Sequence, residues 1–117
     1  MNNTYQGFDN ATYEEVQEYL KEFGRKNNLN DKQNDSPTVQ EFLDLYAIFP
    51  FIRYIGYIIK KPREDYRVSI EGFKIDNLLA EQAEDLKINF SNADEFSDKK
   101  VFGEHIPVLH NVRFWWD

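Results

Sequence analysis

The hydrophobic pattern of this chain changes its period at Pro50. Before the proline, apolar residues recur at helical spacing through residues 36–49, whereas residues 66–75 alternate between apolar and polar side chains. Residues 51–61 are rich in Ile, Tyr and Phe and are apolar on both faces, which is typical of a covered central strand. Because a turn at residues 62–65 joins these two segments, they are predicted to pair as antiparallel strands.

A glycine within the second strand and two further strand-like segments near the C-terminus complete the predicted sheet. Gly72 interrupts the alternation of the second strand, which is typical of a β-bulge, and Phe73 and Ile75 are expected to point inward after it. Residues 95–102 and 109–116 are predicted to form further strands.

Two Thr-x-x-Glu capping boxes predict the starts of two N-terminal helices. In such a box, each of the two side chains accepts a hydrogen bond from a free backbone N–H group of the first turn. Thr12 and Glu15 begin the first helix, expected at about residues 12–25, and Thr38 and Glu41 begin the second.

A third helix is predicted after the hairpin, capped by Asp76 or Asn77. Segments 1–11 and 27–35 are polar and are expected to be flexible. The fold class is therefore α+β: one domain over residues 1–117 with two N-terminal helices, a central hairpin, a third helix and C-terminal strands in one small antiparallel sheet. The apolar stripe of the third helix is Leu79, Ala83, Leu86 and Phe90. The expected core comprises Phe42, Tyr46, Ile55, Val68, Ile70, Leu86 and Phe114.

Composition excludes several classes of protein. The chain of 117 residues contains no cysteine, which excludes a disulfide scaffold, a thiolate zinc site and a cysteine nucleophile. The most apolar stretch, residues 43–59, is broken by Asp44, Pro50 and Arg53 and is too short and too polar to span a bilayer. Since the N-terminus also lacks the features of a secretory signal, we expect a cytoplasmic protein.

Charge is segregated along the chain. Acids outnumber bases nine to four in both residues 1–50 and residues 76–117, whereas residues 51–75 carry six bases and three acids. The net charge of −7 and the pI near 4.8 argue against general nucleic-acid binding, which requires positive charge facing phosphates. They favour a basic protein as the partner.

Rows of like charge on the predicted helices point to a docking surface. Like charges at i, i+4 repel, so a chain that retains them invites a functional explanation, here contact with a basic protein surface. Of Trp115 and Trp116, one is expected in the core, and the other either packs under a loop or is exposed as a binding anchor. The predicted partner-binding residues are Glu14, Glu15, Glu18, Glu22, Glu81, Glu84, Asp85, Asp94, Glu95, Asp98 and Trp115.

A second charged group supports a different class of ligand. The predicted hairpin carries basic residues that could bind nucleic acid, although Glu64 and Asp65 follow them and weaken their field. These alternative nucleic-acid-binding residues are Lys60, Lys61, Arg63 and Arg67.

No catalytic or metal-binding motif is present in the sequence. There is no G-x-S-x-G, glycine-rich phosphate loop or H-E-x-x-H, and the two histidines, His105 and His110, are spaced i, i+5 around Pro107. We therefore expect no catalytic residues, no metal and no cofactor. An enzyme with an unrecognised hydrolytic or metal site is the third alternative.

The leading hypothesis is a small acidic inhibitor that occludes a basic, nucleic-acid-handling protein. Phage anti-defence proteins of the anti-CRISPR kind and toxin-immunity proteins both have this general character. Steered encounter through acidic helices, followed by apolar contacts at the rim, would be its mechanism. A nucleic-acid-binding accessory protein that uses the hairpin at 60–67 is the alternative, and the sequence leaves the oligomeric state open.

Overall fold

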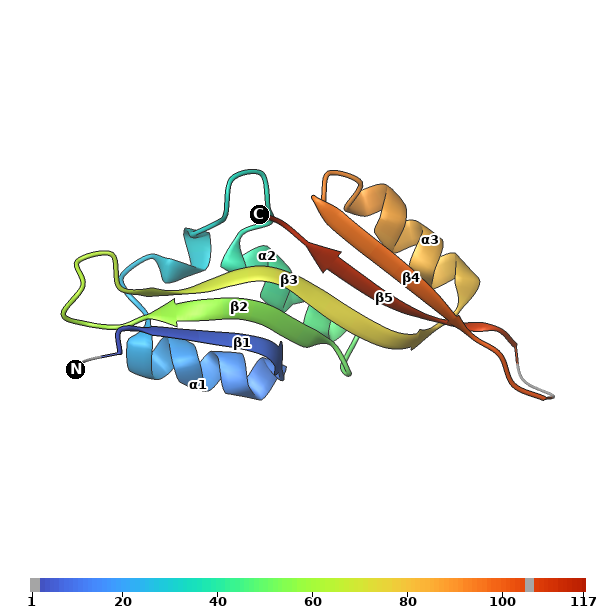
Figure 1. The fold of residues 1–117 in the computed structure, drawn as a ribbon, viewed down its shortest axis with the longest axis horizontal. Helices are drawn as coiled ribbons and strands as arrows, with labels where there is room; N and C mark the ends of the chain where they lie inside the picture. The colour runs from blue at the N-terminus through green and yellow to red at the C-terminus, as the bar shows by residue number, and fades with distance from the viewer. Residues whose placement is uncertain (1–2, 105–106) are drawn as a thin grey trace.

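A five-stranded antiparallel sheet in the order β1-β2-β3-β5-β4 forms the framework of the protein. The computed structural model describes residues 3–104 and 107–117. All three α-helices contribute to one buried core on a single face of this sheet (Figure 1). The strands are β1 (Tyr5–Ala11), β2 (Arg53–Ile59), β3 (Arg67–Leu78), β4 (Glu95–Val101) and β5 (Leu109–Trp115). The helices are α1 (Tyr13–Phe23), α2 (Val39–Asp44) and α3 (Ala80–Asn89), with short 3₁₀ turns η1 (Asn28–Asn30) and η2 (Leu45–Ala47).

The α+β class and the central hairpin are confirmed. β2 and β3 pair antiparallel, and their register shifts so that Ile55 faces Gly72 while Gly56 faces Ile70. Glu71 is therefore the extra residue of a bulge next to Gly72. A side chain at position 72 would place its Cβ 2.1 Å from the carbonyl oxygen of Phe114, so only glycine allows β5 to lie this close.

The predicted element order is wrong at the N-terminus, where β1 precedes α1. Residues 5–11 pair with the outer edge of β2, in a register that shifts between Phe8 and Ala11. The ring of Tyr5 stacks on that of Tyr57 with centroids 5.7 Å apart, and the ring of Phe8 lies 5.3 Å from that of Tyr19. Because the register shift breaks the two-residue alternation, the segment resembles a polar lead-in when its sequence is read alone.

Both N-terminal capping boxes are confirmed. The Thr12 hydroxyl accepts a hydrogen bond from the Glu15 N–H at 3.0 Å, and the Glu15 carboxylate accepts from the Thr12 N–H at 3.1 Å. Thr38 and Glu41 form the same reciprocal pair at the start of α2. Each box satisfies backbone donors that the first helical turn leaves without partners.

The predicted start of α3 is wrong. Strand β3 continues through Leu78, so neither Asp76 nor Asn77 caps the helix. Asn77 adopts a positive φ of 61° within the strand. The helix begins at Ala80 instead, where the Gln82 side chain accepts a hydrogen bond from the N–H of the preceding residue. That residue, Leu79, is 51% exposed and leaves the predicted apolar stripe.

The predicted core is confirmed except for one residue. Tyr46 is only half-buried. Its ring stacks on that of Tyr13 with centroids 4.0 Å apart, and its hydroxyl donates to the exposed Glu14 carboxylate at 3.1 Å. Phe73 and Ile75 point into the core as expected, and Trp116 is buried beside them. The predicted residues found buried are Phe42, Ile55, Val68, Ile70, Leu86 and Phe114.

Asn28, in the segment 27–35, takes the place of a neighbouring strand along part of β3. Its side-chain amide donates to the Val68 carbonyl at 2.7 Å, and its side-chain oxygen accepts from the Val68 N–H at 2.9 Å. Val68 lies before the part of β3 that pairs with β5, which begins at Gly72. The buried side chain therefore satisfies both backbone groups where the sheet offers no partner.

Replacing Asn28 by Ala is expected to lower the free energy of unfolding by about 1–3 kcal/mol, because it leaves two buried backbone groups of Val68 without partners. Chemical denaturation of the parent and the variant measures this difference. Asn30→Ala, which removes an exposed side chain from the same turn, is the control. Equal midpoints and slopes for N28A and the parent would contradict the assigned role.

Candidate binding surface

Four glutamates on α1 form an exposed face that we call the α1 acidic face: Glu14, Glu15, Glu18 and Glu22. Val16 is fully buried on the opposite side of this helix, where it contacts the core, so the amphipathic pattern fixes which side faces solvent. Glu18 and Glu22 form no ion pair within residues 3–104 and 107–117. The predicted acidic surface is therefore present on this helix.

The negative field of this face acts on two nearby phenols. The hydrogen bond to the Glu14 carboxylate, together with its charge, raises the pKa of Tyr46 above its ordinary value. Burial raises the pKa of Tyr19, and the charge of Glu15 raises it further. Both phenols therefore remain neutral donors at neutral pH, and neither adds to the negative charge.

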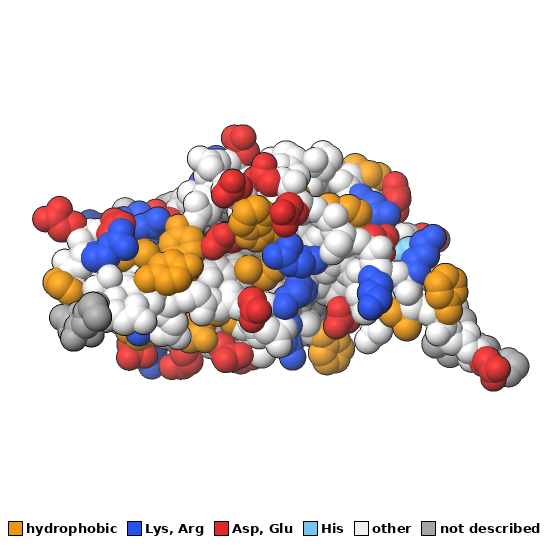
Figure 2. All heavy atoms as spheres, viewed as in Figure 1, with side chains coloured by type: hydrophobic (Ala, Val, Ile, Leu, Met, Phe, Trp, Pro, Cys, Tyr) orange, Lys and Arg blue, Asp and Glu red, His pale blue; other side chains and the backbone are white. Residues whose placement is uncertain are grey.

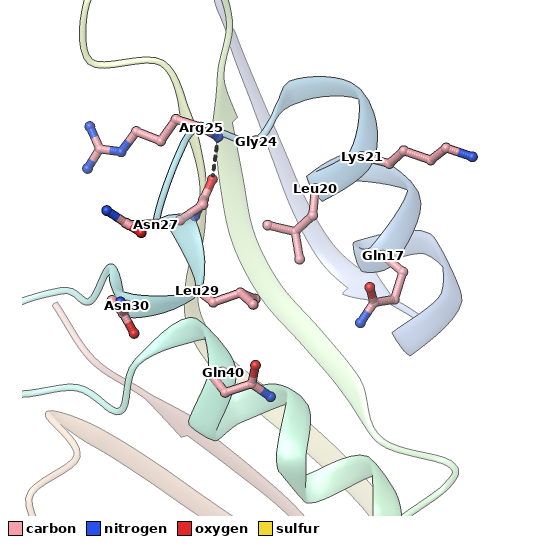
Figure 3. A pocket seen from close by; sticks show the side chains of 10 residues that line it. Gln17, Leu20, Lys21, Gly24, Arg25, Asn27, Leu29, Asn30 and Gln40 are labelled. Atoms are coloured by element: carbon pink, nitrogen blue, oxygen red, sulfur yellow. Dashed lines mark hydrogen bonds between the residues drawn. The ribbon is translucent and has the colours of Figure 1, made fainter.

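A groove runs along one flank of the α1 acidic face, between α1 and the segment formed by η1 and α2 (Figure 3). Its volume is about 590 Å³, and it is open to solvent. Gln17 and Lys21 line it from α1, Gln40 lines it from α2, and the exposed Leu29 projects from η1. Amide groups and the apolar side chains of Leu20 and Leu29 can bind a peptide segment, and among the described residues no pair of acid and base groups lines the groove.

The acids predicted around α3 form a separate group at the other end of the molecule. The protein extends over 54 × 25 × 25 Å, and α1 and α3 lie toward opposite ends of its long axis (Figure 1). Several of these acids have partners: the Glu84 carboxylate lies 3.9 Å from the Lys87 ammonium, and Glu95 lies 3.5 Å from Arg113. The remaining exposed members are Glu81, Asp85 and Asp94, the last of which accepts the N–H of Asp117 at 2.7 Å.

Asp98, one of the predicted partner-binding residues, is engaged within the protein. Its carboxylate contacts His110 Nδ1 at 2.8 Å and Lys87 Nζ at 3.0 Å, and its side chain is only 11% exposed. Burial tends to raise the pKa of Asp98, but hydrogen bonds from His110 and Lys87 outweigh it and hold the pKa below its ordinary value. The cluster links α3, β4 and β5, which is a structural role.

Side chains that could hold a metal ion do not gather at one place among the described residues. No group of three or more His, Cys, Asp or Glu side chains converges there, and His105 lies outside the residues that the structure describes. His110 is engaged by Asp98, as described above.

In the described part of the chain, no helix is long and apolar enough to cross a membrane.

The two tryptophans divide between the faces of the sheet. Trp116 is buried among the aromatic rings of the core, whereas Trp115 is half-buried on the opposite face, where its indole N–H donates to the Glu71 carboxylate at 3.0 Å. Burial raises the pKa of Glu71 even though this bond opposes the shift. Trp115 is thus partly occupied by an internal contact and is a weaker anchor than the sequence indicates.

The basic hairpin is partly neutralised by one of its own carboxylates. Arg63 forms a two-point ion pair with Asp65, with closest approach 2.7 Å, and Arg67 donates to the Asp65 carbonyl at 2.8 Å. Lys60 lies over the Phe23 ring at 5.0 Å and Lys61 over the Tyr66 ring at 4.8 Å. The Asp65 carboxylate offsets part of the positive charge of the hairpin, whereas the two aromatic contacts leave the charges of Lys60 and Lys61 in place.

Sequence reasoning missed a row of cations on the face of the sheet that no described helix covers. Arg53 faces Lys74, and Lys74 faces Arg113, so the three side chains are direct neighbours across β2, β3 and β5. Figure 2 views this face and shows Lys and Arg side chains gathered over the central strands, with acids interspersed. We call Arg53, Lys74 and Arg113 the basic row. Only the strand register brings them together, because they lie far apart in the sequence.

No family model, curated protein or solved structure matches this chain.

Stability is expected to fall in acid through Asp98. Because its pKa in the folded protein lies below the ordinary 3.8, the ionised form stabilises the fold at pH values above that figure. This contribution is lost as the pH falls from the ordinary value through the folded pKa. The stability difference between the parent and Asp98→Asn should therefore be largest near neutral pH and shrink below about pH 4.

Urea denaturation at a series of pH values measures this difference, and Asp85→Asn, at an exposed position of α3, is the control. A constant gap between parent and D98N from about pH 6 to about pH 3 would contradict the assignment.

Proposed function

We propose that this protein binds and occludes a basic, nucleic-acid-handling partner protein, with the α1 acidic face as its main contact surface. The observation that carries the proposal is the exposure of Glu18 and Glu22 without ion pairs in the described residues, in one row with Glu14. A rigid helix keeps these carboxylates at fixed spacing, so their field adds in one direction.

Recognition would proceed in two steps. Long-range attraction to the α1 acidic face accelerates the encounter, and short-range contacts in the adjoining groove slow dissociation. Leu29, which is 41% exposed, offers the apolar contact there, and the amides of Gln17 and Gln40 offer hydrogen bonds. The chemistry is that of a binding protein rather than an enzyme, because the groove holds no acid–base pair.

The α3 acids supply a second contact for a large partner, but they are partly paired with Lys87 and Arg113. Asp98 and Trp115, which have internal partners, contribute least. Phage anti-defence inhibition of the anti-CRISPR kind and toxin immunity are two biological settings of this one mechanism. Both place the protein beside a nuclease or another nucleic-acid-binding protein.

Reversing Glu14, Glu18 and Glu22 to Lys should slow association with the partner severalfold at low salt and much less at high salt, because exposed charges are screened over about 8 Å at physiological ionic strength. The partner is captured from nuclease-treated lysate, identified by mass spectrometry and purified, and association rates are measured by surface plasmon resonance. Added duplex DNA should compete with the protein for the partner.

The matched control reverses Asp9, Glu64 and Glu104, which are exposed elsewhere and give the same change in net charge. Circular dichroism confirms that both variants remain folded. If the two triple variants slow association equally, net charge rather than the α1 acidic face is responsible, and the proposed surface is wrong.

The basic row favours one alternative, a nucleic-acid-binding accessory protein. Arg53 and Lys74 form no ion pair within the described residues. Under this alternative, labelled single-stranded DNA or RNA binds the parent, and binding is lost when the row or Lys60, Lys61 and Arg63 are changed to Ala. Fluorescence anisotropy that shows such micromolar binding, strengthened by the α1 reversals, would overturn the proposed inhibitor function.

A further inference from the structure

Among the described residues, β1 and β4 are the two edge strands of the sheet, and they differ in regularity. The pairing of β1 is interrupted by a register shift between Phe8 and Ala11. By contrast, β4 pairs with β5 without any shift over all seven of its residues. A straight edge presents a row of unpaired N–H and C=O groups to which another strand can add.

Charge along β4 changes sign from one end to the other. Glu95 begins the strand and Asp94 directly precedes it, Lys99 and Lys100 stand near its end, and all four side chains are exposed. When a strand pairs antiparallel with a copy of itself, its start lies against the end of the copy. This charge distribution is therefore complementary to itself in the antiparallel direction, whereas parallel pairing would place like charges together.

The two faces of the strand fix the register of such a pair. With Ser97 on the two-fold axis, Glu95 lies opposite Lys99 of the second copy on the helix-free face. Lys100 of the second copy then comes beside Asp94, the residue that directly precedes β4. Moving the axis to Asp98 would instead place two aspartates opposite each other, which is unfavourable.

An exposed aromatic ring supports the same register. Phe96 packs against Phe114 with ring centroids 4.9 Å apart, yet it is 44% exposed at the edge of the sheet. With the axis at Ser97, the two copies of Phe96 become diagonal neighbours across the new strand pair, a separation that aromatic side chains can bridge. The dimer would cover apolar surface that the monomer leaves in water.

We propose that the protein forms a two-fold dimer in which the β4 strands of two copies pair antiparallel about Ser97, making one continuous ten-stranded sheet. The isologous contact closes on itself, so it yields a dimer and not a fibre. The charges of the edge, which would repel many unrelated strands, serve here to select the second copy. This inference is independent of the proposed function.

Paired charge reversals test the dimer. The parent is expected at twice its 14.0 kDa mass in light scattering after size exclusion, with dissociation on dilution. Lys99→Glu with Lys100→Glu makes this edge wholly acidic, and Asp94→Lys with Glu95→Lys makes it predominantly basic, so each variant alone should be monomeric. An equimolar mixture of the two should recover the dimer mass, because opposite edges then meet.

A cross-link tests the register. The chain has no cysteine, so Ser97→Cys introduces a single thiol whose copies lie opposite each other at the axis, within the Cα separation that a disulfide accepts. Mild oxidation should link S97C into a dimer, while Lys99→Cys, whose two copies lie apart, should link far more slowly. Melting curves confirm that each variant is folded.

A parent that remains monomeric at every concentration in sedimentation equilibrium would overturn the proposal. Charge-reversed variants that stay dimeric would also overturn it, as would equal cross-linking of S97C and K99C.

Discussion

Burial of Phe73 is the contact on which the rest of the structure depends. Its ring is fully buried and lies 5.0–6.3 Å, centroid to centroid, from four other aromatic rings. Those rings belong to α2, to the residue after α3, to β5 and to the chain end: Phe42, Phe90, Phe114 and Trp116. A single side chain of the central strand thus contacts α2, the C-cap of α3, β5 and the C-terminal tryptophan. Offset and edge-to-face aromatic packing makes such contacts directional, which helps to fix how the helices lie on the sheet.

Local signals in the sequence were sufficient for much of this fold. Capping boxes at Thr12 and Thr38, the alternation of β3 and the bulge beside Gly72 each depend on residues a few positions apart, and each is found in the structure. β1 could not be predicted in the same way, because a short edge strand with a shifted register has no regular period. The start of α3 was misplaced because β3 pairs with β5 as far as Leu78, and that pairing overrides the capping preference of Asp76 and Asn77.

In the candidate site, too, local sequence patterns predict some features, and strand pairing decides the others. Exposure of the α1 acidic face follows from the helical period, since Val16 determines which side is buried. The pairing of Asp98 with His110 and Lys87, and of Trp115 with Glu71, depends on which strands are neighbours. The basic row was missed for this reason: Arg113 lies in a segment that is acidic on average, and only the sheet order β2-β3-β5 brings it beside Lys74. Sequence patterns indicate which way a side chain faces, but not which distant side chain it meets.

The length of the molecule sets the minimum length of any partner surface that contacts both of its ends. The long axis is 54 Å, and successive base pairs of duplex DNA are separated by about 3.4 Å, so the protein is as long as about 16 base pairs. A partner that engages both the α1 end and the α3 end needs a continuous basic track of that length, as an enzyme that encloses more than one turn of duplex has. Under the proposed function, a partner that holds only the α1 end would leave most of the molecule projecting away from its surface, and access would then be blocked by bulk rather than by charge.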